Sequence, residues 1–429
     1  MNKSKNNHII IRLIQYILQL AILVKDLHPL CSIPLEGDGD DFAPCIESPE
    51  IVLSRVDDSL NHCQIVPGSC EYCHCRMSSD QLKDIWLTFL STLFDNYHFY
   101  IRSLQVETII HNTLILFSLI LNLTNGQCLK VGFYEKSCPL AEAITRNVIK
   151  QTLALAPSLS GPLLRMFHHD CFVRGCDASV FLDSPTQQTK KDAIPNKILR
   201  GSEVIDRVES ELEMYYSGIV SCADIIVLIS RNVVVRYSGS SWNVETGRRD
   251  GVVSSLNEAL ANLPPPFANI TSLKTNFQQR GLSHKDLVVL SGAHTIGIAQ
   301  CSSFINRLYN FSGQGDNNSF DPTMDPNYVV ELRMKCMKNG PNNLVDMDLG
   351  SSNIFDAHYY DLVSKNRGLF QSDAALLDDG ETNIYVQTHK GGNPASFFKD
   401  FGVSMVNMGR IGVHTGTAGQ IRKVCSKVN

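Results

Sequence analysis

The chain has 429 residues, of which 43% are hydrophobic, and a formal net charge of −5. This length is sufficient for one large globular domain or two ordinary ones. The acidic balance, and the lack of a run dense in lysine and arginine, argue against a nucleic-acid partner. The 14 cysteines are widely scattered, which is typical of disulfides. Glycosylation sequons at Asn269, Asn310 and Asn317 also favour a secretory route.

Residues 1–126 form an N-terminal extension of unknown role. Its apolar stretches, 9–24 and 114–123, both fall short of the ~20 clean apolar residues of a membrane helix, so we predict no stable membrane span. The first fits a signal sequence, an interfacial helix or a buried helix. The second precedes small residues and predicts a signal-like segment at about 105–126. The cluster Cys70-Glu-Tyr-Cys73-His-Cys75 lacks the second pair that a zinc site needs.

From Gln127 to Asn429 the apolar pattern is mainly helical. Two stripes mark buried helix faces: Ile144, Val148, Ile149 and Leu153, then Val204, Ile205, Val208 and Leu212. Ser160-Gly-Pro162 predicts a cap and first-turn proline for a helix through Asp170, and Ser283-His-Lys-Asp286 has capping-box spacing. Strand-like alternation is confined to short pieces such as Trp242–Thr246. We therefore expect a mainly α domain over residues 127–429.

Arg165 and His169 lie four residues apart, so a helix directs both side chains to one face. A fixed cation beside a proton shuttle suits the cleavage of a peroxide, which needs a base, an acid and stabilisation of developing charge. By itself this spacing more often marks a surface arginine and a capping histidine. The residues around the pair are needed to distinguish that interpretation from a catalytic one.

Those neighbours read Leu164-Arg-Met-Phe-His-His-Asp-Cys-Phe-Val-Arg-Gly-Cys-Asp-Ala-Ser179. This long, irregular string resembles the plant secretory (class III) haem peroxidase family. Matches in the expected order include Val220-Ser-Cys-Ala-Asp224, Leu290-Ser-Gly-Ala-His-Thr-Ile-Gly297 and Gln371-Ser-Asp373, and they cover about 127–429. The resemblance implies two helical halves that sandwich a haem b, with short β pieces only. It also implies a monomer in the extracellular space, cell wall or vacuole.

The resemblance implies a role for each matching residue. His169 would be the acid/base that acts on hydrogen peroxide, Arg165 the charge stabiliser and His294 the iron ligand. Asp373 would accept the ring N–H of His294, and Asn196 would orient His169. Pro264 would line the channel for small phenolic donors, each of which returns one electron.

Two calcium sites are also implied. The first would use Asp170, Val173, Gly175, Asp177 and Ser179, whose spacing around one tight loop by itself suits a hard cation, although such loops are more often merely solvated. The second would use Thr295, Asp348, Ser351, Asp356 and a carbonyl of Ile354. The family's disulfides would pair Cys171 with Cys176, Cys222 with Cys425 and Cys301 with Cys336.

The chain departs from the family at several positions. Tyr216 stands where the partner of Cys138 is expected, which leaves Cys138 free unless Cys128 captures it. His168 replaces a phenylalanine and either changes access to the haem or packs as a flat ring. Lys190 replaces the glutamate that supports the first calcium site, and its charge should weaken that site.

Two other functions remain open from the sequence. One is a secreted haem- or calcium-binding structural protein of this fold with little turnover. The other is a zinc hydrolase that uses His168, His169 and His294, which leaves Arg165 and Asp373 without roles.

Overall fold

The computed structural model describes residues 129–429, apart from residues 317 and 393. The signal-like segment at 105–126, the apolar stretch 9–24, the Cys70–Cys75 cluster, Cys128 and Asn317 therefore lie outside the described residues.

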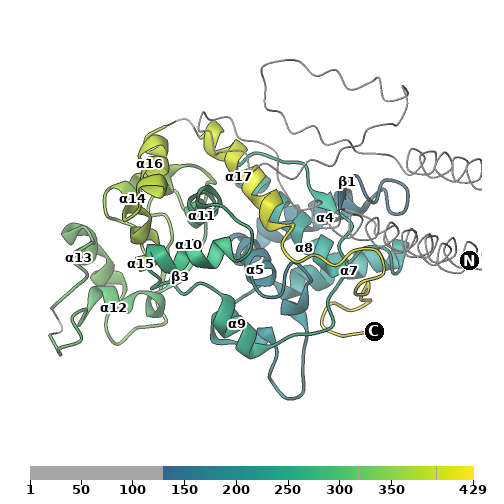
Figure 1. Ribbon diagram of the computed structural model, residues 1–429, viewed down its shortest axis with the longest axis horizontal. Helices are drawn as coiled ribbons and strands as arrows, with labels where there is room; N and C mark the ends of the chain where they lie inside the picture. Colours follow the sequence, from purple (N-terminus) through teal and green to yellow (C-terminus); the bar gives the residue numbers. More distant parts are fainter. Residues whose placement is uncertain (1–128, 317, 393) are drawn as a thin grey trace, which may run out of the picture. The chain divides into compact units, whose positions relative to one another are not determined.

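The described chain is mainly helical, as expected (Figure 1). Its α-helices are α4 (Ala141–Leu155), α5 (Ser160–Cys171), α6 (Ile194–Lys197), α7 (Ser202–Tyr216), α8 (Cys222–Arg236), α9 (Leu256–Asn262), α10 (Ile270–Gln278), α11 (His284–Ser291), α12 (Ile305–Leu308), α13 (Pro326–Lys335), α14 (His358–Ser364), α15 (Gln371–Ala374), α16 (Gly380–His389) and α17 (Ala395–Met408). Short 3-10 turns are η2 (Pro157–Leu159), η3 (Ser179–Phe181), η4 (Lys190–Asp192), η5 (Gly292–Thr295), η6 (Cys301–Ser303) and η7 (Ala375–Leu377).

One group of helices forms around α8, which contacts α4, α5 and α7. Every residue of α8 from Cys222 to Val234 is buried, because the helix is apolar on most of its circumference. The predicted stripe of α7 is buried at all four positions, and in α4 three of the four residues are buried while Ile144 is partly buried. This packing places α5 at the edge of the group (Figure 1).

A second group forms around α11, which contacts α10, α16, α17 and η5. Ser283 is the N-cap of α11 and forms the predicted capping box. Its side chain accepts from the Asp286 backbone N–H, and its own backbone N–H donates to the Asp286 carboxylate. α5 contacts η5, so the two groups meet where α5 and the end of α11 face each other. A smaller core joins α12 and α13 with the strands β3 (Ile298–Gln300) and β4 (Leu344–Asp346).

The β-structure consists of two short antiparallel pairs. β1 (Lys130–Val131) pairs with β2 (Glu245–Thr246), and β3 (Ile298–Gln300) pairs with β4 (Leu344–Asp346). In the segment predicted to be strand-like, 242–246, only the last two residues form a strand. They have a partner in β1, whereas the three preceding residues lie outside any ladder.

The structure contains the three expected disulfides, Cys171–Cys176, Cys222–Cys425 and Cys301–Cys336. Within residues 129–429, Cys138 is the free cysteine; it is buried, and burial raises the pKa of its thiol. Tyr216 packs against the same core.

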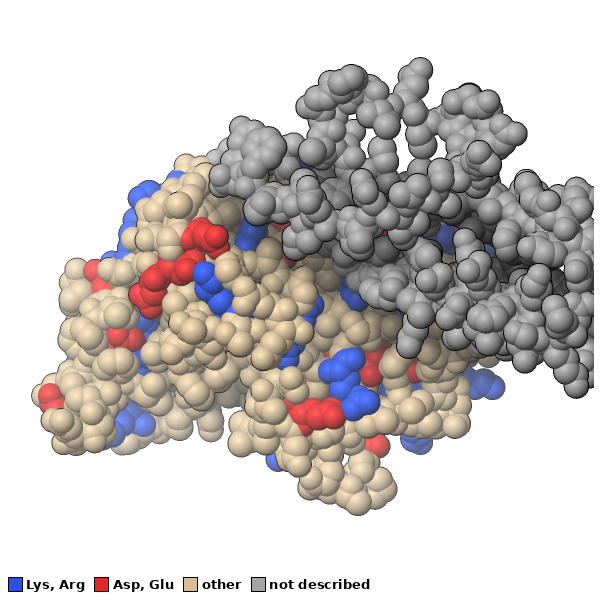
Figure 2. Space-filling model, viewed as in Figure 1, with Lys and Arg blue, Asp and Glu red and all other residues tan. Residues whose placement is uncertain are grey.

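The described helices include none that is both long and apolar enough to cross a membrane. On the face shown in Figure 2, lysine and arginine side chains are interspersed with aspartate and glutamate. The coloured part of this face carries no extended field of one sign.

Candidate functional site

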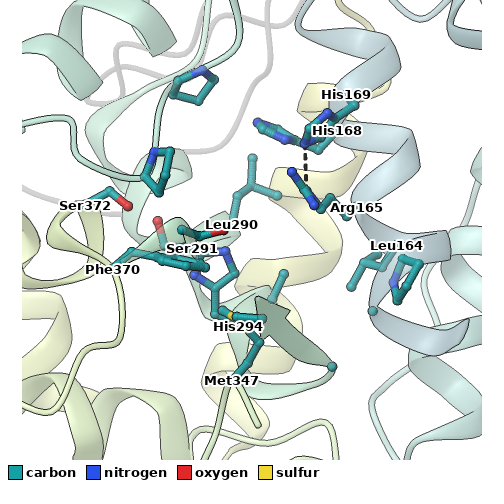
Figure 3. A pocket seen from close by; sticks show the side chains of 18 of the residues that line it. Leu164, Arg165, His168, His169, Leu290, Ser291, His294, Met347, Phe370 and Ser372 are labelled. Carbon is teal, nitrogen blue, oxygen red and sulfur yellow. Dashed lines mark hydrogen bonds between the residues drawn. The ribbon is translucent and has the colours of Figure 1, made fainter. Parts of the chain in front are cut away.

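A cavity of about 530 Å³ lies between α5 and the α11–η5 segment. Arg165, His168 and His169 line one wall and His294 lines the other (Figure 3). Leucine, phenylalanine and methionine side chains supply much of the remaining surface, including Leu290, Met347 and Phe370. A mainly apolar cavity with a few converging polar groups is the usual form of a cofactor or substrate site.

Arg165 and His169 project from consecutive turns of α5, as their spacing predicts. Arg165 Nε donates to His169 Nε2 over 2.8 Å, and Arg165 Nη2 donates to the Pro195 carbonyl over 3.2 Å. The predicted start of this helix was wrong in detail, since α5 already begins at Ser160 and has no side-chain cap. Instead, the Ser160 backbone N–H donates to the Pro157 carbonyl of the preceding turn η2.

The hydrogen bonds of Asn196 determine the tautomer of His169. Asn196 Nδ2 donates to the Lys190 carbonyl over 2.7 Å, which leaves Oδ1 facing His169 Nδ1 at 2.5 Å. An amide oxygen only accepts, so Nδ1 must carry the proton and Nε2 must carry the lone pair. The same tautomer accepts the bond from Arg165. His169 therefore presents a basic nitrogen to the cavity.

Burial, with the charge of Arg165 next in importance, lowers the pKa of His169 well below its usual value. The hydrogen bond to Asn196 acts in the opposite direction. Burial also lowers the pKa of Arg165 to about 10, which leaves the guanidinium charged at neutral pH. The pair is thus a neutral base beside a permanent cation, the combination that peroxide cleavage requires.

On the opposite wall, His294 Nδ1 lies 2.8 Å from Asp373 Oδ1. Asp373 is buried, and burial by itself would raise the pKa of its carboxyl. The charge and hydrogen bond of His294, together with hydrogen bonds from Phe370 and Tyr359, outweigh burial and lower that pKa. Tyr359 Oη also donates to Asp373 Oδ1, over 2.9 Å, and the Phe370 backbone N–H donates to Oδ2 over 2.8 Å. We did not predict these two supporting donors, although Phe370 lies three residues before Asp373 in helix-capping spacing.

The His168 ring packs against the Phe172 ring, with centroids 4.1 Å apart and planes tilted by 52°, and it still lines the cavity. Burial, helped by the charges of Arg165 and Arg280, lowers the pKa of His168 to about 3. The ring is therefore neutral at physiological pH and does not compete with His169 as a cationic acid. Pro264 also lines the cavity.

The residues expected at the second calcium site converge. Thr295 Oγ1 lies 3.1 Å from both Asp348 Oδ2 and Asp356 Oδ1, and Ser351 Oγ donates to Asp356 Oδ2 over 2.6 Å. The Ile354 backbone N–H donates a hydrogen bond to the Ser351 carbonyl, so Ile354 belongs to the same cluster. His358, which the sequence did not single out, contacts Asp348 Oδ1 over 2.6 Å. This cluster adjoins His294, the residue before Thr295.

The residues expected at the first calcium site also form one buried group: Asp170, Val173, Gly175, Asp177 and Ser179. The Lys190 ammonium lies among them and ion-pairs with both Asp170 and Asp177. In the part of the chain that is described, no three His, Cys, Asp or Glu side chains are grouped to hold a metal ion. His168 and His169 lie on the wall opposite His294, so the structure does not bring these three histidines together as a zinc triad.

A family model described as peroxidase matches residues 145–391. Peroxidase 56 of Arabidopsis thaliana is 54% identical over 306 residues, which cover 71% of this chain and 92% of that protein. Peroxidase 27 of the same plant is 53% identical over 305 residues, which cover 71% and 94%. Peroxidase 1 of Oryza sativa subsp. japonica is 50% identical over 300 residues, which cover 69% and 92%. The chain therefore belongs to the haem peroxidase family, whose members are oxidoreductases that act on hydrogen peroxide.

Proposed function

We propose that this haem peroxidase is a secreted enzyme that oxidises small phenolic donors by one-electron steps, with residues 127–429 as its catalytic domain. One observation carries the assignment of its site. Two histidines face a single cavity, and each is oriented through Nδ1 by a different acceptor, His169 by Asn196 and His294 by Asp373.

The His294 wall fits a haem. Because His294 Nδ1 is committed to the Asp373 carboxylate, Nε2 is the nitrogen left to bind iron, and the structure gives it no hydrogen-bond partner among the described residues. A carboxylate behind a ligating imidazole makes it a stronger donor. The apolar lining and the volume of about 530 Å³ suit a flat, largely apolar ring. When bound, haem b would hold the two oxidising equivalents that hydrogen peroxide delivers and pass them on to the donors one electron at a time.

On the opposite wall we assign proton transfer to His169. Its Nε2 lone pair takes a proton from one peroxide oxygen and returns it to the oxygen that leaves as water. The Arg165 cation stabilises the negative charge that develops on the leaving oxygen. Arg165 Nε must give up its bond to His169 for this, and the bond to the Pro195 carbonyl keeps the guanidinium in place.

The donor class follows from the cavity's lining. Pro264 and the two prolines after it contribute apolar surface, and His168 and His169 are the uncharged imidazoles nearby. A small phenol can pack its ring against such a surface and give up its hydroxyl proton to a neutral base. The proposed donors are accordingly phenols rather than charged metabolites.

We propose a single calcium ion, at the second of the expected sites. Thr295, Asp348, Ser351 and Asp356 bring hydroxyl and carboxylate oxygens together, and a carbonyl of Ile354 completes a set that a hard cation prefers. An ion there would fix η5, which carries His294, against the segment before α14. His358 occupies one oxygen of Asp348 and would have to share it.

Secretion is supported by the three disulfides, which persist in oxidising compartments. The sequon residue Asn269 is exposed, although its side chain also accepts the Ser272 N–H at the start of α10. We propose an extracellular, cell-wall or vacuolar monomer.

The test is peroxide-dependent oxidation of guaiacol by the full chain after loading with haem and calcium. Wild type should turn over, and His169→Leu should lose at least about 100-fold in the peroxide step while it retains haem. Wild-type protein that binds haem but bleaches with peroxide without oxidising the phenol would contradict the proposal. That result would support a haem-binding structural protein with little turnover, a reading that the named peroxidase relatives do not favour.

A further inference from the structure

The Lys190 side chain is fully buried, with 0% of its surface exposed. Its Nζ donates to the carbonyls of Val173 and Asp170, the latter over 3.4 Å, and lies 3.4 Å from Asp177 Oδ1. A second carboxylate oxygen, Asp170 Oδ1, is 3.7 Å away. A buried ammonium without such partners is strongly unfavourable, so these contacts are what allow the side chain to be inside.

The oxygens around the ammonium are those expected to bind the first calcium ion. Carbonyl and carboxylate oxygens of Asp170, Val173 and Asp177 now surround a nitrogen. Calcium needs six to eight oxygens at about 2.3–2.6 Å, and a second cation at that distance from the same atoms would be repelled by the ammonium. Ser179 Oγ points its proton at Asp177 Oδ1 and so acts there as a donor.

The charge of Lys190 is consistent with an ammonium that replaces a calcium ion. Exchange of the family's glutamate for Lys190 adds two positive charges, which equals the charge of one calcium ion. The carboxylates of Asp170 and Asp177 also accept hydrogen bonds from the chain's own backbone. Asp170 accepts from the backbone N–H groups of Ala178 and Val180, and Asp177 accepts from that of Ser179.

Lys190 is also connected to the peroxide side of the cavity. Its carbonyl accepts from Asn196 Nδ2 over 2.7 Å, and Asn196 Oδ1 orients His169. Asp170, which the ammonium contacts, is the residue after His169 on α5. The ammonium therefore links η4 to the end of α5. η4 contains the Lys190 carbonyl that fixes Asn196, and α5 contains His169.

We propose that the ammonium of Lys190 takes the place of the first calcium ion, and that Lys190 is a positioning residue for His169. The site then holds a cation that is part of the chain, and the enzyme binds calcium only on the His294 side. The first calcium site is the one that the family resemblance implies, and the positioning role rests on the proposed function of His169.

Lysine labelling of the wild-type, haem-loaded full chain tests the position of the ammonium without any turnover. Amine-directed acetylation in the presence of saturating calcium, followed by peptide mass spectrometry, should leave Lys190 unmodified. Lys191 is the internal control, because its side chain is 46% exposed and should be labelled. Labelling of Lys190 that appears on addition of calcium would show that calcium displaces the ammonium, and would overturn the proposal.

Calcium content provides the second measurement. The ratio of calcium to haem, measured by elemental analysis after desalting, should be higher by one in Lys190→Glu than in wild type. Lys191→Glu makes the same charge change on the exposed neighbour and should leave the ratio unchanged. Equal ratios in wild type and Lys190→Glu would show that these oxygens are not a cation site, and the proposal would fall. Neither measurement depends on peroxidase turnover. The proposal that Lys190 replaces calcium can therefore fail while the proposed function stands.

The positioning role has its own readout. Lys190→Met should lower kcat/KM for hydrogen peroxide about 10-fold and leave kcat/KM for the phenol unchanged, since an outer partner of a catalytic group acts through orientation. Added calcium should restore the peroxide step in Lys190→Glu but not in Lys190→Met. Equal loss for both substrates, or rescue of neither variant, would indicate a purely structural lysine.

Discussion

His169 Nδ1 lies 2.5 Å from Asn196 Oδ1, and this contact decides which nitrogen of the imidazole faces the cavity. The amide is itself fixed, because its nitrogen is committed to a backbone carbonyl. The histidine thus has one available tautomer, with a lone pair at Nε2.

Asn196→Ala should slow the peroxide step by about 10- to 100-fold, as the loss of an orienting outer partner typically does. Loss of the amide also removes the one interaction that raises the pKa of His169, so the remaining base is weaker. Single-turnover kinetics with hydrogen peroxide measure this directly. Asn276→Ala is a matched control elsewhere, since Asn276 Nδ2 only bonds the Asn262 carbonyl. An Asn196→Ala enzyme with the wild-type rate would contradict the assigned role.

Arg165→Leu should reduce the same step by about 100-fold, because the developing charge loses its cation. Arg165→Lys should recover only part of the rate, since an ammonium has no second arm to hold the Pro195 carbonyl. The comparison is made on kcat/KM for peroxide at fixed donor concentration. Equal values of kcat/KM for Arg165→Lys and Arg165→Leu would show that the geometry of the guanidinium, rather than its charge, matters at this residue.

Asp373→Asn should weaken haem retention or the peroxide step by about 10- to 100-fold. The amide keeps the shape of the side chain but removes the negative charge behind His294. Tyr359→Phe deletes one donor to the Asp373 carboxylate, so it should make this carboxylate more basic, and its effect on the rate should be smaller. Resonance Raman spectroscopy of the iron–histidine stretch separates these cases. An unchanged stretch in Asp373→Asn would contradict the role.

Acid should destabilise the protein through His168. Its pKa is about 3 in the folded state and near 6.5 when unfolded, so the unfolded chain binds more protons below pH 6.5. The contribution of this residue to stability is therefore complete above pH 6.5 and is lost as the pH falls toward 3. His168→Phe should flatten the fall of Tm over that interval, measured by calorimetry. Parallel Tm curves for wild type and variant would refute this.

Replacing Cys222 and Cys425 by serine should cost about 2–5 kcal/mol of unfolding free energy, because this bridge closes the longest loop, with a separation of 203 residues. Cys138→Ala is the control, since Cys138 is buried but has no bridge within the described chain. Urea unfolding compares the variants. A double serine variant as stable as the control would show that the bridge contributes little.

Sequence patterns were sufficient for the contacts that depend on short spacing. Arg165 and His169 share a helix face, the Ser283 capping box begins α11, and the stripe of α7 is buried. The family resemblance extended this to distant residues, and the structure brings His294 and Asp373 together as it implied.

Other features depend on tertiary packing and had no signal in the chain. The Tyr359 bond to Asp373 and the His358 bond to Asp348 join residues from different segments. The sequence indicated that Lys190 would oppose the first calcium site, but not that its side chain would be buried among the expected ligands. That placement depends on tertiary packing, which brings η4 against the end of α5.

The Cys301–Cys336 bridge encloses the exposed turn at residues 311–316. A protease in the surrounding medium that cut this turn would produce two fragments, yet they would stay joined by that bridge and by Cys222–Cys425. The cavity walls on α5 and η5 both lie on the N-terminal side of such a cut, whereas Asp373 lies on the other. Nicked molecules should therefore migrate as one species without reductant, and the two fragments would stay joined only while the environment remains oxidising.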